Sequence, residues 1–406
     1  MIQNLQATFE PLTVSPSPQN LRRGIFLTAG FAMFSMFFGS GNLVFPLVTG
    51  QITKDQSSFA MWGLMLTGTL VPFLGLLTMI FVDGNAKRFF TKLGKIPGFL
   101  LPFFLLAILG PFGVCARCIL VSYGSLELVF PHLPFSVFTV TFSAIGALLT
   151  LNRNKIVGIL GKYLTPFLLF GIVSILVVGL WLAPPMDAAP HTPLEAFHVG
   201  LHQGYQLMDL LAAFFFSVSI VAYLRAHMGH DAPVEKVAKE AIKASAVGIT
   251  LLAFVYLGFV TLGASFSQQL QGVSPEHMLV QIAQHTLGDA ALPIVALTIT
   301  MACLTTLIAL AGLFADFCET EIFAKRVARS HLVIVTYALC CLVSFLGFES
   351  LARVMGSLLE YLYPALIVLS LASILDYYTK KNWAPRAFYY ALILVVVLKL
   401  LNEHVF

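Results

Sequence analysis

The sequence predicts an all-α polytopic membrane protein. Of its 406 residues, 58% are hydrophobic and only 10% are charged. Apolar stretches of about 18 residues or more recur along the chain, and each is long enough to cross a bilayer as a helix. We predict eleven such helices, at 24–48, 57–83, 99–128, 134–151, 155–182, 201–225, 241–265, 291–317, 331–347, 353–377 and 385–403.

The distribution of Lys and Arg predicts the orientation of these helices. Alternate connections contain most of the 23 Lys and Arg residues, whereas two of the opposite connections, 183–200 and 266–290, contain none. Because positively charged loops stay on the cytoplasmic side, the N-terminus is expected inside and the C-terminus outside. Residues 1–23 are then a cytoplasmic tail.

The helix count also predicts an internal repeat. Two five-helix units are expected at 24–182 and 201–378, joined by an outside linker at 183–200 and followed by one additional helix within 379–406. A unit with an odd number of helices, repeated once, gives two halves of opposite orientation, which is common in transporters. The first helix of each unit has an interrupted pattern.

The first interruption lies at Gly39, Ser40, Gly41 and Asn42, within the first apolar stretch. Each glycine costs roughly 1 kcal/mol in a helix relative to alanine, and Pro46 a turn later lacks a backbone donor. One interpretation is a flexible helix whose small residues permit close packing. The other is a broken helix whose freed backbone groups hold a solute.

Asp209 marks the corresponding region of the sixth helix, after Tyr205 and Met208. A carboxylate deep in a membrane helix costs ~2.5–3.5 kcal/mol on insertion scales, so it is expected to face a polar cavity. It either reaches water near the outer end of its helix, or orients an unwound segment and contacts a substrate ammonium group or a cation.

Two adjacent threonines, Thr305 and Thr306, lie in the middle of the eighth helix. Such hydroxyls often only bond a carbonyl one turn back, but they are also hard oxygen ligands suited to a small cation. At ~1.5 Å per residue, Thr305 lies ~18 Å from the cytoplasmic side, and Phe38 and Asp209 have similar depths. These residues therefore converge near the midplane of the membrane.

Arg117 is a lone basic residue within the third helix. A buried guanidinium needs a partner inside the bundle, and Asp209 is one candidate. We interpret Arg117 as a structural charge.

Enzymatic chemistry is not indicated. The sequence has no phosphate-binding GxxxxGK[ST] loop, no HExxH motif and no nucleophile elbow, and it has no basic patch of the kind that binds nucleic acid. We therefore expect no enzyme activity, no cofactor, no nucleic-acid partner and no obligatory protein partner.

Several motifs together resemble a known family. They are Phe38-Gly-Ser-Gly-Asn42 through Pro46, Gly110-Pro111 with Arg117, Ser122 and Glu127, Gly161-Lys-Tyr-Leu-Thr165-Pro166, Gly204-Tyr205 with Met208-Asp209, and Ala302-Cys-Leu-Thr305-Thr306. The chain resembles the bacterial branched-chain amino acid:cation symporters, the LIVCS group of the amino acid–polyamine–cation superfamily. It departs from them at Ala116-Arg117-Cys118, where family members often read Pro-Arg-Thr, and in having eleven predicted helices where twelve are usual.

The resemblance implies the leucine-transporter fold, a five-plus-five inverted repeat with broken first and sixth helices, in the bacterial inner (cytoplasmic) membrane. It implies sodium-coupled import of leucine, isoleucine and valine across the lipid bilayer. The amides of Ser40 and Gly41 would face the substrate carboxylate. Sodium would be held by carbonyls near Ser35 and Phe38 together with the Thr305 and Thr306 hydroxyls.

Two other functions stay open at this point. One is a proton-coupled carrier of another neutral amino acid, with Asp209 as the proton site. The other, of a different class, is a membrane scaffold or sensor that transports nothing.

Overall fold

The computed structural model describes residues 25–82, 84–151, 165–229 and 232–405. The expected cytoplasmic tail, 1–23, and the predicted start of the fifth helix, 155–164, lie outside the described residues. Within them all the regular secondary structure is helical. The first half contains α1 (Ile25–Phe37), α2 (Ser40–Thr53), η2 (Lys54–Gln56), α3 (Ser57–Met65), η3 (Leu66–Leu70), α4 (Val71–Phe81), α5 (Ala86–Thr91), α6 (Pro97–Leu109), α7 (Val114–Glu127), α8 (Phe135–Leu151) and α10 (Thr165–Trp181). The second half contains α11 (Pro193–Gln206), α12 (Asp209–Met228), α13 (Val234–Ser265), η5 (Pro275–His277), α14 (Met278–Leu287), η6 (Asp289–Ala291), α15 (Leu292–Phe317), η7 (Cys318–Ile322), α16 (Arg329–Ser344), α17 (Phe348–Thr379) and α18 (Ala384–Val405).

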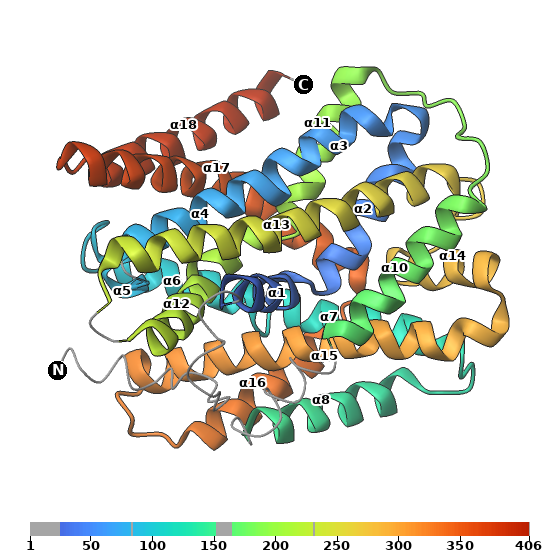
Figure 1. Cartoon of the computed structure of the whole chain (residues 1–406), viewed down its shortest axis with the longest axis horizontal. Coiled ribbons are helices and arrows are strands. Elements are labelled where there is room, and N and C mark those ends of the chain that lie inside the picture. The colour runs from blue at the N-terminus through green and yellow to red at the C-terminus, as the bar shows by residue number, and fades with distance from the viewer. Residues whose placement is uncertain (1–24, 83, 152–164, 230–231, 406) are drawn as a thin grey trace.

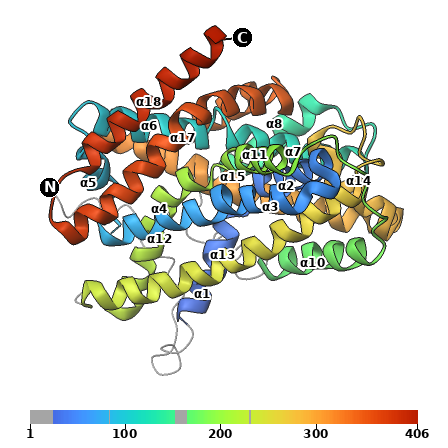
Figure 2. The same ribbon diagram turned by 90° about the horizontal axis from the view of Figure 1, so that it is seen from above.

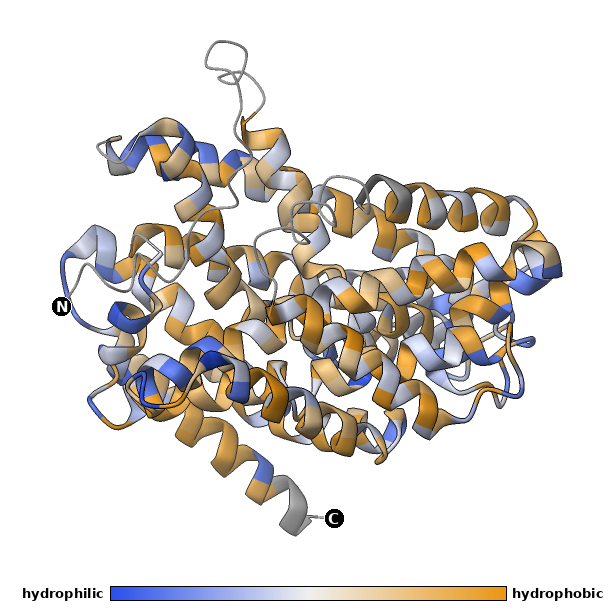
Figure 3. Ribbon diagram, turned by 90° about the horizontal axis from the view of Figure 1, so that it is seen from below, coloured by the Kyte–Doolittle hydropathy of each residue, from blue (hydrophilic) through white to orange (hydrophobic). Residues whose placement is uncertain are grey.

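The long helices are suited to a bilayer. In the described part of the chain, 7 helical segments are long and apolar enough to span a membrane, and α1, α8, α16 and most of α10 are shorter apolar helices. Figure 3 shows hydrophobic residues along most of their length, with the hydrophilic ones gathered mainly near ends and loops. Outward-facing apolar side chains such as Trp62 and Phe170 are each 72% exposed, as expected of a surface that faces lipid. The protein is therefore a multi-pass membrane protein.

The two halves pack on each other reciprocally (Figures 1 and 2). Helices α1 and α2 lie against α13, and α11 and α12 lie against α3 and α4. Glycines allow the backbones to touch, since a methyl group on Gly50 would lie 1.9 Å from the Val260 carbonyl oxygen. In the contact between α11 and α3, a methyl group on Gly200 would lie 1.8 Å from the Ala60 carbonyl oxygen. The first helix of each half thus packs on the second helix of the other, as an inverted repeat requires.

Several predicted boundaries are wrong: the seventh helix, expected from 241, begins at Val234, and the tenth, expected from 353, begins at Phe348. The sixth helix, expected from 201, begins at Pro193, so that the last eight of the eighteen residues of the expected linker 183–200 are helical. Thr192 caps it: the Glu195 amide donates to Thr192 Oγ1, and the Thr192 amide donates to Glu195 Oε2 at 2.7 Å. This reciprocal capping box, with proline in the first turn, satisfies amides that a helix end leaves unpaired.

The third helix, expected to be continuous over 99–128, is interrupted between α6 and α7. A methyl group on Gly113 would lie 2.2 Å from the Ile108 carbonyl oxygen, so the chain passes too close to itself for another residue here. The Phe112 amide donates to the Ala107 carbonyl, five residues back, which is one residue more than an α-helix allows. The turn at 110–113 redirects α7 toward the two broken helices.

Candidate functional site

The first helix is broken at Phe38 and Gly39, and α2 already begins at Ser40. Gly39 is extended, with φ −129° and ψ −161°, and its amide donates to Oδ1 of Asn42 at 3.0 Å. In a continuous helix this amide would donate to the Ser35 carbonyl, which therefore loses its regular partner. The break is thus shorter than the predicted Gly39–Asn42, and Ser40, Gly41 and Asn42 form the first turn of the new helix.

The second break, at Leu207 and Met208, separates α11 from α12. Met208 is in the left-handed region, at φ 62° and ψ 17°, although its side chain is fully buried. A non-glycine residue held there stores of the order of 1–3 kcal/mol, a strain that often marks a functional site. Asp209 follows as the first residue of α12, where the helix dipole favours a negative charge.

A buried hydrogen-bond network joins the two breaks. Nδ2 of Asn42 donates to Oδ2 of Asp209 at 2.9 Å and also to the hydroxyl of Tyr256 on α13. Tyr256 in turn donates to the same Asp209 oxygen at 2.8 Å. Asn42 and Asp209 are each 2% exposed. Among the described residues, two neutral donors, Asn42 and Tyr256, thus hold the Asp209 carboxylate between the interrupted segments.

Tyr256 was not among the sequence-predicted site residues. It is a single tyrosine in an apolar stretch of the seventh helix, and it is fully buried. A buried phenol needs a hydrogen-bond partner, so the sequence could have indicated that Tyr256 faces a polar group. The sequence could not indicate that this group is Asp209.

The predicted sodium ligands are only partly brought together. Oγ1 of Thr306 lies 3.3 Å from the Phe38 carbonyl oxygen, to which it donates. Thr305 is half-buried, and its hydroxyl bonds its own helix at the Ala302 carbonyl, 2.8 Å away. A methyl group on Gly39 would lie 2.9 Å from the Thr306 side chain. The eighth helix therefore approaches the first break through Thr306.

Asp209, one candidate partner for Arg117 in the sequence analysis, is not its hydrogen-bond partner in the structure. The Arg117 guanidinium donates to the backbone carbonyl of Gln206 at 3.0 Å and to Oε1 of the same residue at 2.8 Å. It lies over the rings of Phe45 and Phe348, at 5.0 and 5.9 Å from their centroids. The geometry explains the pairing, because the carbonyls at the C-terminal end of α11 attract a cation. Arg117 thereby links α7, α2, α11 and α17.

Tyr205 and Ser40 complete the surroundings of the breaks. The Tyr205 ring lies 4.5 Å from that of Tyr363, whose hydroxyl accepts from the Leu210 amide at 3.2 Å. Ser40 is fully buried, and its hydroxyl accepts from the Cys118 thiol at 3.5 Å. A methyl group on Gly41 would lie 3.4 Å from both Cα and the carbonyl oxygen of Leu207, so the two breaks nearly touch.

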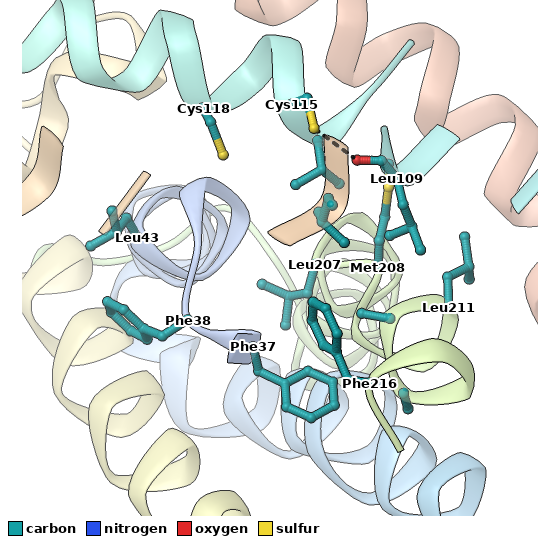
Figure 4. Close-up of a cluster of buried hydrophobic side chains, with 14 of the residues drawn as sticks. Phe37, Phe38, Leu43, Leu109, Cys115, Cys118, Leu207, Met208, Leu211 and Phe216 are labelled. Carbon is teal, nitrogen blue, oxygen red and sulfur yellow. Dashed lines mark hydrogen bonds between the residues drawn. The ribbon is translucent and has the colours of Figure 1, made fainter. Parts of the chain in front are cut away.

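Figure 4 shows the three interrupted helices meeting in one buried region. It includes Phe37, Phe38 and Leu43 from around the first break, Leu207, Met208 and Leu211 from around the second, and Leu109 and Cys115 from either side of the turn in the third. The backbone groups that the breaks free from helical hydrogen bonds thus lie next to apolar side chains. Such a site can bind a small solute with a charged end and an aliphatic end.

Comparisons with known proteins identify the family of this chain. Residues 23–405 match the family model described as "Branched-chain amino acid transport protein". The chain is 30% identical over 357 residues to the branched-chain amino acid permease BrnQ of Bacillus subtilis, covering 84% of this chain and 78% of that protein. It is 29% identical over 362 residues to BrnQ of Escherichia coli K12, covering 86% and 81%.

Solved structures share the fold. Mhp1, a nucleobase-cation-symport-1 family transporter, superposes with a TM-score of 0.59 at 16% identity over 95% of this chain and 94% of its own. MhsT, in complex with L-phenylalanine, has a TM-score of 0.58 at 14% identity, covering 95% and 99%. The fold is that of the leucine transporter, with broken first and sixth helices, and the relatives are transporters rather than enzymes. This chain belongs to the branched-chain amino acid transport protein family.

Proposed function

We propose that this protein is a sodium-coupled symporter that imports leucine, isoleucine and valine across the bacterial inner membrane by alternating access. The names of its relatives support the substrate class, and the Lys and Arg distribution supports a cytoplasmic N-terminus. The observation that carries the proposal is the buried Asn42–Asp209–Tyr256 network, which links the two broken helices around a carboxylate.

The substrate carboxylate would dock at the start of α2. The amides of Ser40 and Gly41 are in the first turn, so they lack intrahelical acceptors and sit at the positive end of the helix dipole. The substrate ammonium group would be held near Asp209, whose buried carboxyl group has only the neutral partners Asn42 and Tyr256 in its network. A bound ammonium group would favour the ionised carboxylate, so that a zwitterion would meet a charge of opposite sign at each end.

The aliphatic side chain would enter a pocket formed by Phe37, Phe38, Tyr205 and Met208. These are buried or half-buried apolar side chains next to the breaks. Leucine, isoleucine and valine differ by one methylene or its placement, which an apolar pocket distinguishes by only ~1–3 kcal/mol. Broad selectivity among the three is therefore expected.

Sodium would bind between α15 and the first break. Its ligands would be the carbonyls of Ser35 and Phe38 and the hydroxyls of Thr305 and Thr306. Each threonine donates its single proton to a carbonyl, and this leaves the lone pairs of the hydroxyl oxygen available to a cation. Sodium binding would fix the break in the shape that binds the substrate, so that each ligand favours the other.

The test is uptake of labelled leucine into proteoliposomes, with sodium and proton gradients imposed separately. Uptake driven by sodium alone is expected. Uptake driven by the pH gradient alone would show that the carrier is proton-coupled, with Asp209 as the candidate proton site. A scaffold or sensor would show no uptake under either gradient, and substrate binding would be unaffected by replacing Thr305 and Thr306 with alanine.

A further inference from the structure

Three ionisable side chains form a cluster away from the proposed site, where α11, α17 and α18 meet. Both carboxylate oxygens of Glu360 are engaged: Oε1 lies 2.6 Å from Nε2 of His202, and Oε2 accepts from Nζ of Lys399. The ammonium group of Lys399 also lies over the ring of Tyr361, 4.4 Å from its centroid. The three side chains are partly exposed, with 42% of the His202 side chain accessible.

The depth of this cluster makes it unusual. At ~1.5 Å per residue, His202 lies ~14 Å from the outer end of α11, and Glu360 lies ~18 Å from the outer end of α17. Both depths fall within a hydrocarbon core ~30 Å thick, where ionisable groups are rare and usually functional. Glu360 and Lys399 neutralise each other. With Glu360 and Lys399 paired, the imidazole of His202 is the side chain of this cluster that can take up a proton.

His202 belongs to a row of contacts that holds α11 against α17. Tyr205 stacks on Tyr363, with ring centroids 4.5 Å apart, and Gln206 Nε2 donates to the Ala352 carbonyl at 2.9 Å. The three α11 residues are three and four positions apart, so they share one face of the helix. We call these three contacts, made by His202, Tyr205 and Gln206, the outer clamp. Since α11 leads directly into the second break, separating the clamp would open the path from outside to Asp209.

The charged surroundings of His202 are simple. Helix α17 supplies Glu360, with Tyr361 and Tyr363 nearby, and α18 supplies Lys399. Helix α11 itself carries Tyr205, Glu195 and His198, and the first turns of α17 carry Glu349 and Arg353; among the described residues, no hydrogen bond or ion pair joins these four charged groups to His202. The other segments packed on α11, namely α2, α3 and η3, contain no Asp, Glu, His, Lys or Arg. Protonation of the His202 imidazole would thus act mainly on the Glu360 carboxylate, 2.6 Å away.

We propose that His202 binds a proton from the outer solution and that this proton strengthens the outer clamp. A neutral imidazole makes an ordinary hydrogen bond to Glu360, whereas an imidazolium makes a charge-assisted one. Acid outside therefore favours the closed arrangement of α11 and α17. The proposal rests on the transport function above, in which α11 moves during each cycle, and it makes the proton a regulatory ligand separate from the coupling ion.

The first experiment measures sodium-driven leucine uptake with equal pH on both sides of the proteoliposome. Between about pH 8 and pH 5.5, the initial rate of the wild type is expected to fall about threefold. His202→Gln keeps a nitrogen donor but cannot titrate, and its rate is expected to stay nearly constant. His198→Gln is the matched control, an exposed histidine one turn earlier on α11, and should behave like the wild type. A His202→Gln protein that keeps the full pH dependence, or a wild type without any, would overturn the proposal.

A second experiment does not require transport. Ala352→Cys, in a background with Cys341→Ser, reports opening of the clamp through its labelling by a membrane-impermeant maleimide. The ratio of labelling rates with and without His202→Gln, taken at one pH, cancels the pH dependence of the thiol. The ratio is expected to favour the His202→Gln protein at about pH 5.5 and to approach one at pH 8. A ratio of one at both values would contradict the proposal, and absent leucine uptake would contradict the transport function alone.

Discussion

Replacing Thr306 with valine removes one hydroxyl from the proposed sodium site and keeps nearly the same side-chain shape. The side chain is 3% exposed, and its hydroxyl donates to the Phe38 carbonyl at 3.3 Å. A sodium ion bound there would lose one oxygen ligand, and removing one partner of a buried charged group costs ~1–3 kcal/mol. A loss of that size in sodium binding corresponds to an increase of about 5- to 150-fold in the half-saturating sodium concentration.

The assay is the initial rate of leucine uptake into proteoliposomes as a function of sodium concentration. Thr298→Val is the matched control: it lies on the same helix, is 1% exposed, and donates to the Ile294 carbonyl of its own helix at 2.8 Å. Thr306→Ser, which restores the hydroxyl, should recover most of the sodium affinity. If Thr306→Val and Thr298→Val have the same half-saturating sodium concentration, the assignment of Thr306 as a sodium ligand is refuted.

Three further predictions concern the breaks themselves. Gly41→Leu should abolish leucine uptake while membrane insertion stays normal, because its Cβ would already be in contact with the Leu207 backbone at 3.4 Å and the rest of the side chain would fill the space between the breaks; surviving uptake would mean that this break is not the binding site. Met208→Gly should be more stable than Met208→Ala by ~1 kcal/mol, measured by thermal unfolding in detergent, since both lose the side chain but only glycine adopts positive φ without strain. Equal stabilities would argue against strain at this residue. Tyr256→Phe leaves Asp209 with one donor fewer and should weaken leucine binding by ~1–3 kcal/mol, measured by calorimetry; unchanged affinity would exclude the network from the binding site.

The fold was largely predictable from the sequence, because its main signals are local. Apolar stretches and the alternation of charged loops are properties of neighbouring residues, and the breaks are marked by Gly39 and by the polar residues around Asp209. The start of α11 was missed although its signal was present: Thr192 followed by Glu195 is a capping box. The turn at 110–113 was missed because its glycines lie inside a long apolar stretch, and the length of that stretch favoured one continuous helix.

The partners within the site were harder to predict, since they depend on tertiary packing. Arg117 pairs with Gln206, 89 residues away in sequence, and Asn42 meets Tyr256 across 214 residues. The two threonines show a further limit. Consecutive helical residues point about 100° apart, so only Thr306 faces the Phe38 carbonyl while Thr305 bonds its own helix. Which of the two points toward the first break depends on the rotation of α15 about its axis, and the sequence does not specify this rotation.

The central claim is that sodium and a branched-chain amino acid bind together at the broken helices. Calorimetric titration of leucine into the purified protein, in sodium chloride and in potassium chloride of equal ionic strength, tests it most directly. Leucine affinity is expected to be at least about fivefold higher in sodium, in line with a coupling free energy of ~1 kcal/mol or more. Equal affinity in the two salts would contradict the claim.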